Sequence, residues 1–283
     1  GAGKEGPHVN IDRVWAVFFS ATGTTRKVVT HLATAIAADL GVGCSSYDFT
    51  LPAARQGTPS FAPGDLIVLG TPVYAGRVPN VLVQYLATLQ GNGAVAVPVV
   101  VFGNRDYDDA LVELRDILEA AGCHTVAAAA FVGEHAFSDI LGAGRPDKAD
   151  MNIIAGFARE VSAKLSTLSR SAMPAPISVS GVPRPYRPHY RPADPEGRPL
   201  DFRSIRPLTS DACNDCKLCV EVCPMGSIDY DNVREYTGIC IRCGACVKLC
   251  PQGARYYDDP AYLRHKQELE QGFARRAEPA LFI

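Results

Sequence analysis

The sequence predicts an α/β protein in which a doubly wound parallel sheet of five strands is followed by a small α+β domain. Three observations support this prediction. Apolar runs alternate with helical periodicity from residue 14 to about residue 168, and nine prolines and six arginines then crowd into residues 173–207. Eight of the ten cysteines form two short repeats beyond that stretch.

The alternating pattern positions each element of the first domain. We expect strands at residues 14–20, 43–49, 65–70, 95–103 and 124–132, and helices at residues 25–39, 80–90, 108–121 and 147–169. Strands that alternate with helices in this way build a mostly parallel sheet with helices on both of its faces.

Composition divides the chain into five segments. Residues 1–11 read as a flexible leader rather than a signal peptide because they lack an apolar core, and residues 12–172 form the first domain.

Proline removes backbone donors and favours extended geometry, so residues 173–207 are expected to be a semi-rigid linker or a strap laid across a domain surface. Its arginines are either solvated or dock an acidic partner. Residues 208–257 hold the cysteine repeats, and residues 258–283 form a tail helix whose last four residues pack back onto the protein.

The overall composition excludes two classes of partner. With 283 residues, 47% hydrophobic and 20% charged, the chain resembles ordinary two-domain proteins, and its net charge of -2 gives no reason to expect nucleic acid. The longest apolar stretch, residues 94–102, contains Pro98 and is far shorter than the roughly 18 residues of a membrane span. We therefore expect no nucleic acid, no membrane partner and a cytoplasmic location.

The two cysteine repeats carry the strongest chemical signal. Each has the spacing C-x2-C-x2-C-x3-C-P, and the second begins 27 residues after the first. Three thiolates at this spacing can converge on one 4Fe-4S cubane, while the fourth reaches a neighbouring cubane. Structural zinc sites use two close pairs of ligands instead, so two zinc ribbons fit poorly. The spacing predicts one cluster on Cys213, Cys216, Cys219 and Cys250, and a second on Cys223, Cys240, Cys243 and Cys246.

Over about residues 208–257 the repeats resemble the two-cluster bacterial ferredoxins. The resemblance implies one-electron chemistry at low potential. The two other cysteines, Cys44 and Cys123, have no cysteine or histidine at ligand spacing, and we expect them to be buried as small apolar residues.

A hydroxyl-rich turn joins the first expected strand to the first expected helix. Backbone amides at a helix N-terminus can point at an anion, Gly23 lets the backbone approach, and hydroxyl groups can donate from Ser20, Thr22, Thr24 and Thr25. A simple N-capping cluster is the alternative. The turn has neither the lysine of a Walker A loop nor a G-x-G-x-x-G fingerprint, so a nicotinamide cofactor is not supported.

This turn resembles the phosphate-binding loop of flavodoxins, because Ser20, Thr22, Gly23 and Thr25 match the pattern Ser/Thr-x-Thr-Gly-x-Thr. Thr24 stands where flavodoxins often have asparagine. The resemblance covers about residues 12–168 and implies the strand order 2-1-3-4-5, with FMN bound where the first, third and fourth loops meet. It implies that Tyr74 or Tyr107 stacks on the flavin, that backbone amides bond its polar edge, and that Arg77 contacts the ring. The residues expected to bind FMN are Ser20, Thr22, Gly23, Thr24, Thr25, Pro72, Val73, Tyr74, Ala75, Gly76, Arg77, Gly103, Asn104, Arg105 and Tyr107.

Together the two halves resemble the fused flavodoxin-ferredoxin family of anaerobic bacteria and archaea. The resemblance implies an electron-transfer protein that relays single electrons between two 4Fe-4S clusters and FMN, with soluble redox donor and acceptor proteins as partners. The alternative is an FMN-dependent reductase of a small molecule, fed by the cluster domain, in which His135 or Tyr107 supplies a proton. A redox sensor acting through the proline-rich stretch has no signalling module to support it. The sequence assigns no catalytic residue and leaves open whether flavin and clusters meet within one chain or across a homodimer.

Overall fold

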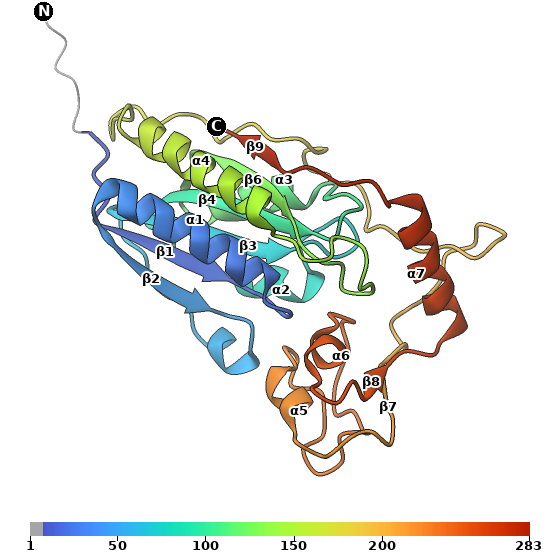
Figure 1. Cartoon of the computed structure of the whole chain (residues 1–283). Helices are drawn as coiled ribbons and strands as arrows, with labels where there is room; N and C mark the ends of the chain where they lie inside the picture. The colour runs from blue at the N-terminus through green and yellow to red at the C-terminus, as the bar shows by residue number, and fades with distance from the viewer. Residues whose placement is uncertain (1–7) are drawn as a thin grey trace, which may run out of the picture.

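The computed structural model describes residues 8–283 and shows a large sheet domain with a small domain below it (Figure 1). The strands of the large sheet, in chain order, are β1 Arg13–Phe18, β2 Gly43–Asp48, β3 Asp65–Pro72, β4 Val95–Phe102, β5 His124–Thr125, β6 Ala128–Val132 and β9 Ala280–Phe282. The sheet order is β2-β1-β3-β4-β6-β9, with β5 paired to β4 as well. All pairs are parallel except that of β6 with β9. The order 2-1-3-4 followed by a fifth strand is that of flavodoxin-like doubly wound sheets, as predicted.

Four helices cover the two faces of the sheet. α1 Thr24–Leu40 and α4 Lys148–Leu165 pack together on one face, and α2 Asn80–Leu86 and α3 Ala110–Ala120 cover the other (Figure 1). The short helix η1, Pro52–Arg55, follows β2. β4 is buried along its whole length, as expected for the middle of a sheet that is covered on both faces.

The fifth strand differs from the prediction in being interrupted. The carbonyl of Thr125 accepts a hydrogen bond from the backbone of Ile177, and the carbonyl of Val126 accepts one from the Lys164 ammonium group. These two carbonyls therefore have partners other than a neighbouring strand of the sheet, and the element divides into β5 and β6. The edge beyond β6 is covered by β9, an antiparallel strand that the C-terminus contributes and that the sequence prediction of five strands did not include.

The expected flexible leader lies mostly outside the described residues. Of it, residues 8–11 are described and lie against the end of the large domain: the backbone N–H of Val9 donates to Leu168, His8 bridges to Ser169, and Ile11 is buried. For residues 8–11 the expectation of a flexible leader is therefore wrong.

The small domain contains the two cysteine repeats. Its elements are β7 Leu208–Thr209, α5 Leu218–Val222, α6 Ala245–Leu249 and β8 Arg255–Tyr256, and β7 pairs with β8. The helix α7, Pro260–Gly272, follows and leads the chain back to β9 (Figure 1). None of the helices between residues 8 and 283 is long and apolar enough to cross a membrane.

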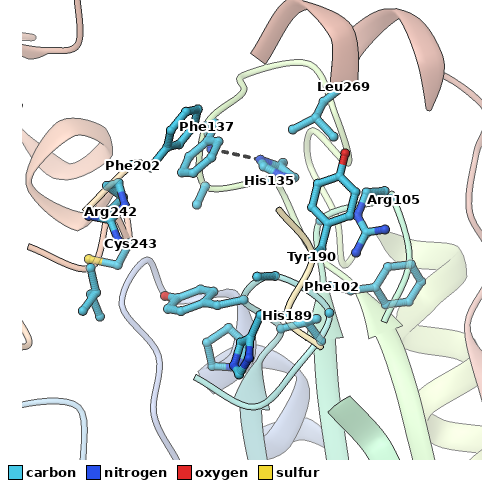
Figure 2. A pocket seen from close by; sticks show the side chains of 18 of the residues that line it. Phe102, Arg105, His135, Phe137, His189, Tyr190, Phe202, Arg242, Cys243 and Leu269 are labelled. Atoms are coloured by element: carbon cyan, nitrogen blue, oxygen red, sulfur yellow. Dashed lines mark hydrogen bonds between the residues drawn. The ribbon is translucent and has the colours of Figure 1, made fainter. Parts of the chain in front are cut away.

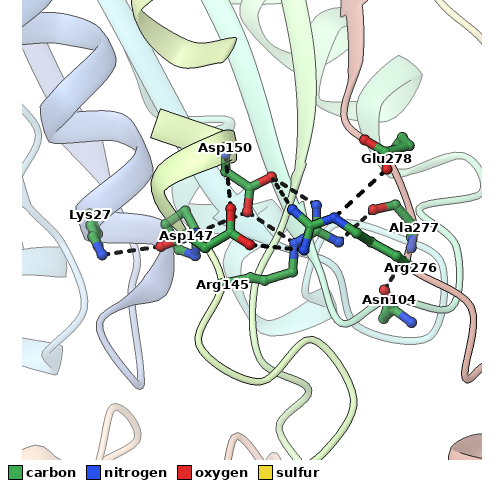
Figure 3. Close-up of polar contacts among 9 residues, drawn as sticks. Lys27, Asn104, Arg145, Asp147, Asp150, Arg276, Ala277 and Glu278 are labelled. Carbon is green, nitrogen blue, oxygen red and sulfur yellow. Dashed lines mark hydrogen bonds and ion pairs between the residues drawn. The ribbon is translucent and has the colours of Figure 1, made fainter. Parts of the chain in front are cut away.

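The tail after α7 is fixed to the large domain by buried polar contacts (Figure 3). The Asn104 side chain donates to the carbonyls of Phe273 and Arg275, each at 2.7 Å, and accepts from the N–H of Ala277 at 3.0 Å. Arg145 donates to the carbonyl of Ala277 and forms a buried ion pair with Asp150. The small domain is therefore connected to the large one at both ends, by residues 173–207 before it and by the tail after it.

Candidate functional site

The turn after β1 has the geometry of an anion-binding loop. Gly23 has a φ of +97° and immediately precedes α1, so the first N–H groups of a 17-residue helix open toward the turn. The hydroxyl of Ser20 accepts from the N–H of Arg26, and the N–H of Ser20 donates to Thr50 on the neighbouring loop. These bonds fix the conformation of the turn.

The turn after β3 is a tight hairpin from Tyr74 to Arg77, closed by two backbone hydrogen bonds. Ala75 and Gly76 at its tip have φ values of +53° and +76°. Glycine is favoured at 76 because its φ is left-handed and because a β-carbon there would lie 2.3 Å from a carboxylate oxygen of Asp108, which would have to move. The N–H of Asp109 donates to Gly76, which ties this hairpin to the loop after β4.

The loops after β1, β3 and β4 border a single cavity of about 820 Å³, within the usual size range of cofactor sites. Eleven of the fifteen residues expected to bind FMN line it, namely Ser20, Thr22, Thr24, Thr25, Pro72, Val73, Tyr74, Ala75, Gly76, Gly103 and Arg105. The cavity lies at the carboxyl edge between β1 and β3, where the strand order reverses. Its hydroxyl-rich end beside α1 and its size fit a flavin with one phosphate.

The other four residues lie elsewhere. The Arg77 guanidinium donates two hydrogen bonds, of 3.0 and 2.7 Å, to the Glu113 carboxylate. The Tyr107 ring packs against Phe102, with ring centroids 5.4 Å apart. The side chain of Asn104 is committed to the tail, and Gly23 serves the turn through its backbone. The buried carboxylate of Glu113 explains the direction of Arg77, because a buried charge needs a partner.

The proline-rich segment forms a strap that covers part of the cavity. We use the name strap for residues 182–203, of which His189, Tyr190 and Phe202 line the cavity (Figure 2). The N–H of Tyr190 donates to the carbonyl of Ala75 at 2.7 Å, so the strap is attached to the tip of the β3 hairpin. Sequence analysis did not predict this wall, because the segment has no periodicity to show which side chains face inward.

A buried carboxylate, Asp109, anchors the strap. It accepts hydrogen bonds from the N–H groups of Val182 and Arg187 and from the Arg187 guanidinium. Burial alone would raise the pKa of Asp109, but these hydrogen bonds outweigh it and lower the pKa to about 2.

The strap is therefore expected to loosen in acid. Because the folded pKa of Asp109 is below its ordinary value, the stabilisation is complete above about pH 4 and is lost as the pH falls toward 2. Amide hydrogen exchange in residues 182–190, corrected for intrinsic rates, should rise over this range. In Asp109→Asn the exchange should already be high at pH 5. Equal protection of both proteins at pH 5 would contradict the anchoring role.

Further residues line the cavity from the loop after β6 and from α7, among them His135, Phe137 and His265. The sequence offers His135 as a candidate proton source. Burial, with His265, Lys248 and Arg105 nearby, lowers the pKa of His135 to about 4, and its ring accepts from the N–H of Phe137 (Figure 2). It is therefore neutral near pH 7.

The two cysteine repeats have nearly the same backbone geometry. In each, the first cysteine accepts from the N–H two residues later and the fourth accepts from the N–H four residues later, all at 3.4 Å; these sulfurs belong to Cys213, Cys223, Cys240 and Cys250. The Arg255 guanidinium adds a contact of 3.5 Å to Cys246. Hydrogen bonds to cluster sulfurs are one of the factors that set the reduction potential.

The fourth cysteine of the first repeat lies with three cysteines of the second. Cys223, Cys240, Cys243 and Cys246 border one small cavity of the cysteine domain, as the crossed cluster assignment requires. Among residues 8–283 no three His, Cys, Asp or Glu side chains converge as ligands of a single metal ion. The thiolates of a cubane bind four different irons, so they need not converge in that way. The assignment of ligands to clusters stays a prediction.

The second repeat faces the large domain. Ile241, Arg242 and Cys243 line the large cavity, and both Ile241 and Cys243 also border the small one (Figure 2). Tyr74 and Cys243 both line the large cavity, and burial with the nearby Cys243 raises the pKa of Tyr74 well above its usual range. The Lys248 ammonium group joins the domains by pairing with Glu134 at 2.7 Å.

Close contact between the domains breaks the symmetry of the repeats. Gly244 and Lys217 occupy equivalent positions, and both have left-handed backbones with φ of +78° and +68°. Lys217 carries a side chain there, whereas a β-carbon on Gly244 would lie 2.7 Å from the carbonyl oxygen of Ala136 on the β6–α4 loop. Glycine at 244 therefore allows the second repeat to approach the large domain.

We expect Gly244→Lys to push the second repeat away from the large domain, because a β-carbon at 244 would collide with the carbonyl of Ala136. Amide hydrogen exchange in residues 134–138, which include this carbonyl, should rise. The matched variant Lys217→Gly changes the equivalent position of the first repeat and should leave this exchange unchanged. Equal exchange in Gly244→Lys and the unaltered chain would contradict the close approach.

Comparison with known proteins identifies one part of the chain. Residues 212–255 match the family of 4Fe-4S dicluster domains. No curated protein matches the chain. The strand order and this match together show a flavodoxin-like domain followed by a 4Fe-4S dicluster domain.

Solved structures similar to this chain include two flavodoxins and an oxidoreductase. The flavodoxin of Streptococcus pneumonia TIGR4 is 22% identical, with a TM-score of 0.38, over 54% of this chain and 99% of that one. A flavodoxin from the domain Archaea is 10% identical, with a TM-score of 0.39, over 54% of this chain and 98% of that one. The apo form of the NADH:FMN oxidoreductase EMOB is 17% identical, with a TM-score of 0.39, over 57% of this chain and 94% of that one.

Proposed function

We propose that this chain is an electron-transfer protein that relays single electrons between two 4Fe-4S clusters and an FMN. It would thereby couple one-electron and two-electron redox partners in anaerobic metabolism. Flavin takes up two electrons and can release them singly, whereas each cluster carries one.

One observation carries this proposal. Cys243, a ligand in the predicted assignment, borders both the large cavity and the small cavity of its own repeat. The cluster on the second repeat would then be adjacent to the flavin within a single chain, without a second subunit. The cluster on the first repeat would lie farther out, where Cys216 is exposed and soluble donor or acceptor proteins can approach.

The residues of the chain would divide the task of holding FMN. The hydroxyl groups of Ser20, Thr22, Thr24 and Thr25, with the amides at the start of α1, would bind the phosphate. The β3 hairpin, with Tyr74, and the loop after β4 would flank the ring system. The strap would limit access of water to the ring.

Anaerobic reconstitution tests the proposal. We expect about eight irons and one FMN per chain. When a one-electron donor reduces the clusters, the flavin should be reduced at a rate independent of protein concentration, because both cofactors belong to one chain. About four irons, failure to bind FMN, or a rate that rises with protein concentration would each overturn the relay.

Thr22→Val tests the phosphate loop. The change removes one hydroxyl donor from the cavity and should weaken FMN binding by about 1–2 kcal/mol. Fluorescence quenching of free FMN by the apoprotein measures this affinity. Thr34→Val, on the exposed part of α1, is the control with the same chemistry. Unchanged affinity in Thr22→Val would remove Thr22 from the site.

A second candidate function is an FMN-dependent reductase of a small molecule that uses the cluster domain as its electron supply. The observation that favours it is the extent of the cavity. Its lining continues past the three loops to the strap, α7 and the β6–α4 loop.

A further inference from the structure

The large cavity extends beyond the flavodoxin-like loops. There its walls come from the strap, from α7, from Phe137 on the β6–α4 loop and from Arg242 of the second repeat (Figure 2). We call this part the roofed compartment and define it by His189, Tyr190, Phe202, Phe137, His265 and Arg242. Two of its walls, the strap and α7, lie outside the five-stranded sheet and its covering helices.

Flat aromatic faces make up most of the roofed compartment. Tyr190 and His265 are stacked with ring centroids 6.1 Å apart, and Phe202 meets His265 edge-on at 5.6 Å. Phe137 packs against His265 at 6.2 Å, and the Arg105 guanidinium lies over Tyr190 at 4.2 Å. Rings held in this way favour a flat, conjugated ligand, because aromatic faces prefer offset stacking or edge contacts.

His189 brings an unused polar atom to this compartment. Its Nε2 is shielded from solvent and has no hydrogen-bond partner among the residues that the structure describes. A buried polar atom without a partner is costly, so it marks a place where a ligand atom would be stabilised. Burial and the neighbouring Arg77 lower the pKa of His189, so the ring is neutral near pH 7 and can hydrogen-bond to an oxygen.

Apart from the exposed Asp106, whose carboxylate accepts from the N–H of Asp108, the carboxylates that line the large cavity are paired with cations. The carboxylate of Glu134 is paired with Lys248, and that of Asp201 with Arg203. Arg242 donates to the carbonyl of Cys240 and has no carboxylate partner within the described part of the chain. A guanidinium group without a carboxylate is suited to bind one from a ligand.

We propose that the roofed compartment binds a planar, conjugated carboxylate beside the flavin, with Arg242 on the carboxylate, His189 on a polar atom and Phe202 against the planar face. This inference rests on the proposed FMN site and names the class of small molecule that would bind beside the flavin. The strap therefore serves as a wall that selects the ligand.

Titration of the oxidised holoprotein with benzoate tests the inference. A planar ligand beside the flavin changes its absorbance spectrum, so the difference spectrum reports binding without any turnover. Benzoate should produce a saturable change. Cyclohexanecarboxylate, which is charged but not planar, and benzyl alcohol, which is planar but uncharged, should each bind at least about tenfold more weakly.

Two variants locate the site. His189→Phe keeps the planar face and removes the nitrogen, and it should weaken benzoate binding about tenfold; the control His31→Phe, on the exposed side of α1, should not. Arg242→Gln should weaken benzoate more than benzyl alcohol, with iron content measured in the same sample.

The outcomes separate this inference from the proposed function. A holoprotein with full iron and FMN whose flavin spectrum does not respond to benzoate, or responds equally to all three compounds, would overturn the inference and leave the relay intact. Failure to bind FMN would overturn both. Unchanged benzoate affinity in His189→Phe and in Arg242→Gln would remove the compartment as the site.

Discussion

Replacing Cys243 with alanine is expected to disconnect the flavin from the clusters. The variant loses one thiolate of the cluster next to the large cavity and should retain about four irons per chain. FMN should still bind, because the phosphate loop and the β3 hairpin are unchanged. The fast phase of flavin reduction by a one-electron donor should disappear, as stopped-flow absorbance would detect.

Cys216→Ala is the matched control for this experiment. It removes a thiolate from the outer cluster, where the side chain is exposed, and should also leave about four irons. The cluster beside the cavity remains, so electrons that reach it should still pass to the flavin. If the two variants reduced their flavins at the same rate, Cys243 would not mark the route.

A large loss of stability is expected from Asp150→Ala. Asp150 is fully buried and receives two hydrogen bonds from Arg145, at 2.8 and 3.0 Å, as well as one from the backbone of Asp147 (Figure 3). The change would leave the Arg145 guanidinium buried without its partner, which should lower the free energy of unfolding by about 3–5 kcal/mol. Urea unfolding followed by circular dichroism measures the difference.

Asp147→Ala provides a graded comparison at the same helix terminus. Asp147 is more exposed and caps α4, so its loss should cost only about 1 kcal/mol. The double change Arg145→Met with Asp150→Leu should recover part of the stability, because it leaves no uncompensated charge. Equal losses from Asp147→Ala and Asp150→Ala would show that burial of the pair is unimportant.

Local patterns predicted most of the large domain, because each of its strands and helices has its own apolar periodicity. Helix α1 starts within one residue of the prediction, and the hydroxyl-rich turn before it lines the cavity. Parallel strands bring their carboxyl ends to one edge, so the meeting of three loops could also be foreseen. The short strand β9 could not be predicted from the sequence, because three residues are too few to show a periodic pattern.

Long-range partners were beyond sequence analysis. Arg77 lies in a loop of the site, just before a predicted helix. Only the structure shows that its side chain forms an ion pair with the buried Glu113. The proposed role of His189 likewise depends on the path of the strap, which Asp109 fixes through hydrogen bonds to Val182 and Arg187, 73 and 78 residues later in the sequence. The cysteine spacing predicted cluster ligands because bonding to iron restricts which spacings are possible. The reason for glycine at 244, by contrast, is its contact with Ala136, which only the structure shows.

The attachment of the cysteine domain at both of its ends has a consequence for kinetics. A carrier that diffuses must find its partner again for every electron, and dilution slows it. In the proposed relay, the covalent connections before and after the domain, with the Asn104 and Arg145 contacts on the returning chain, would keep the effective concentration of one redox centre at the other high and constant. Electron exchange between the clusters and the flavin should therefore have the same rate at high and at low protein concentration. Only the encounter with external redox partners should depend on their concentration.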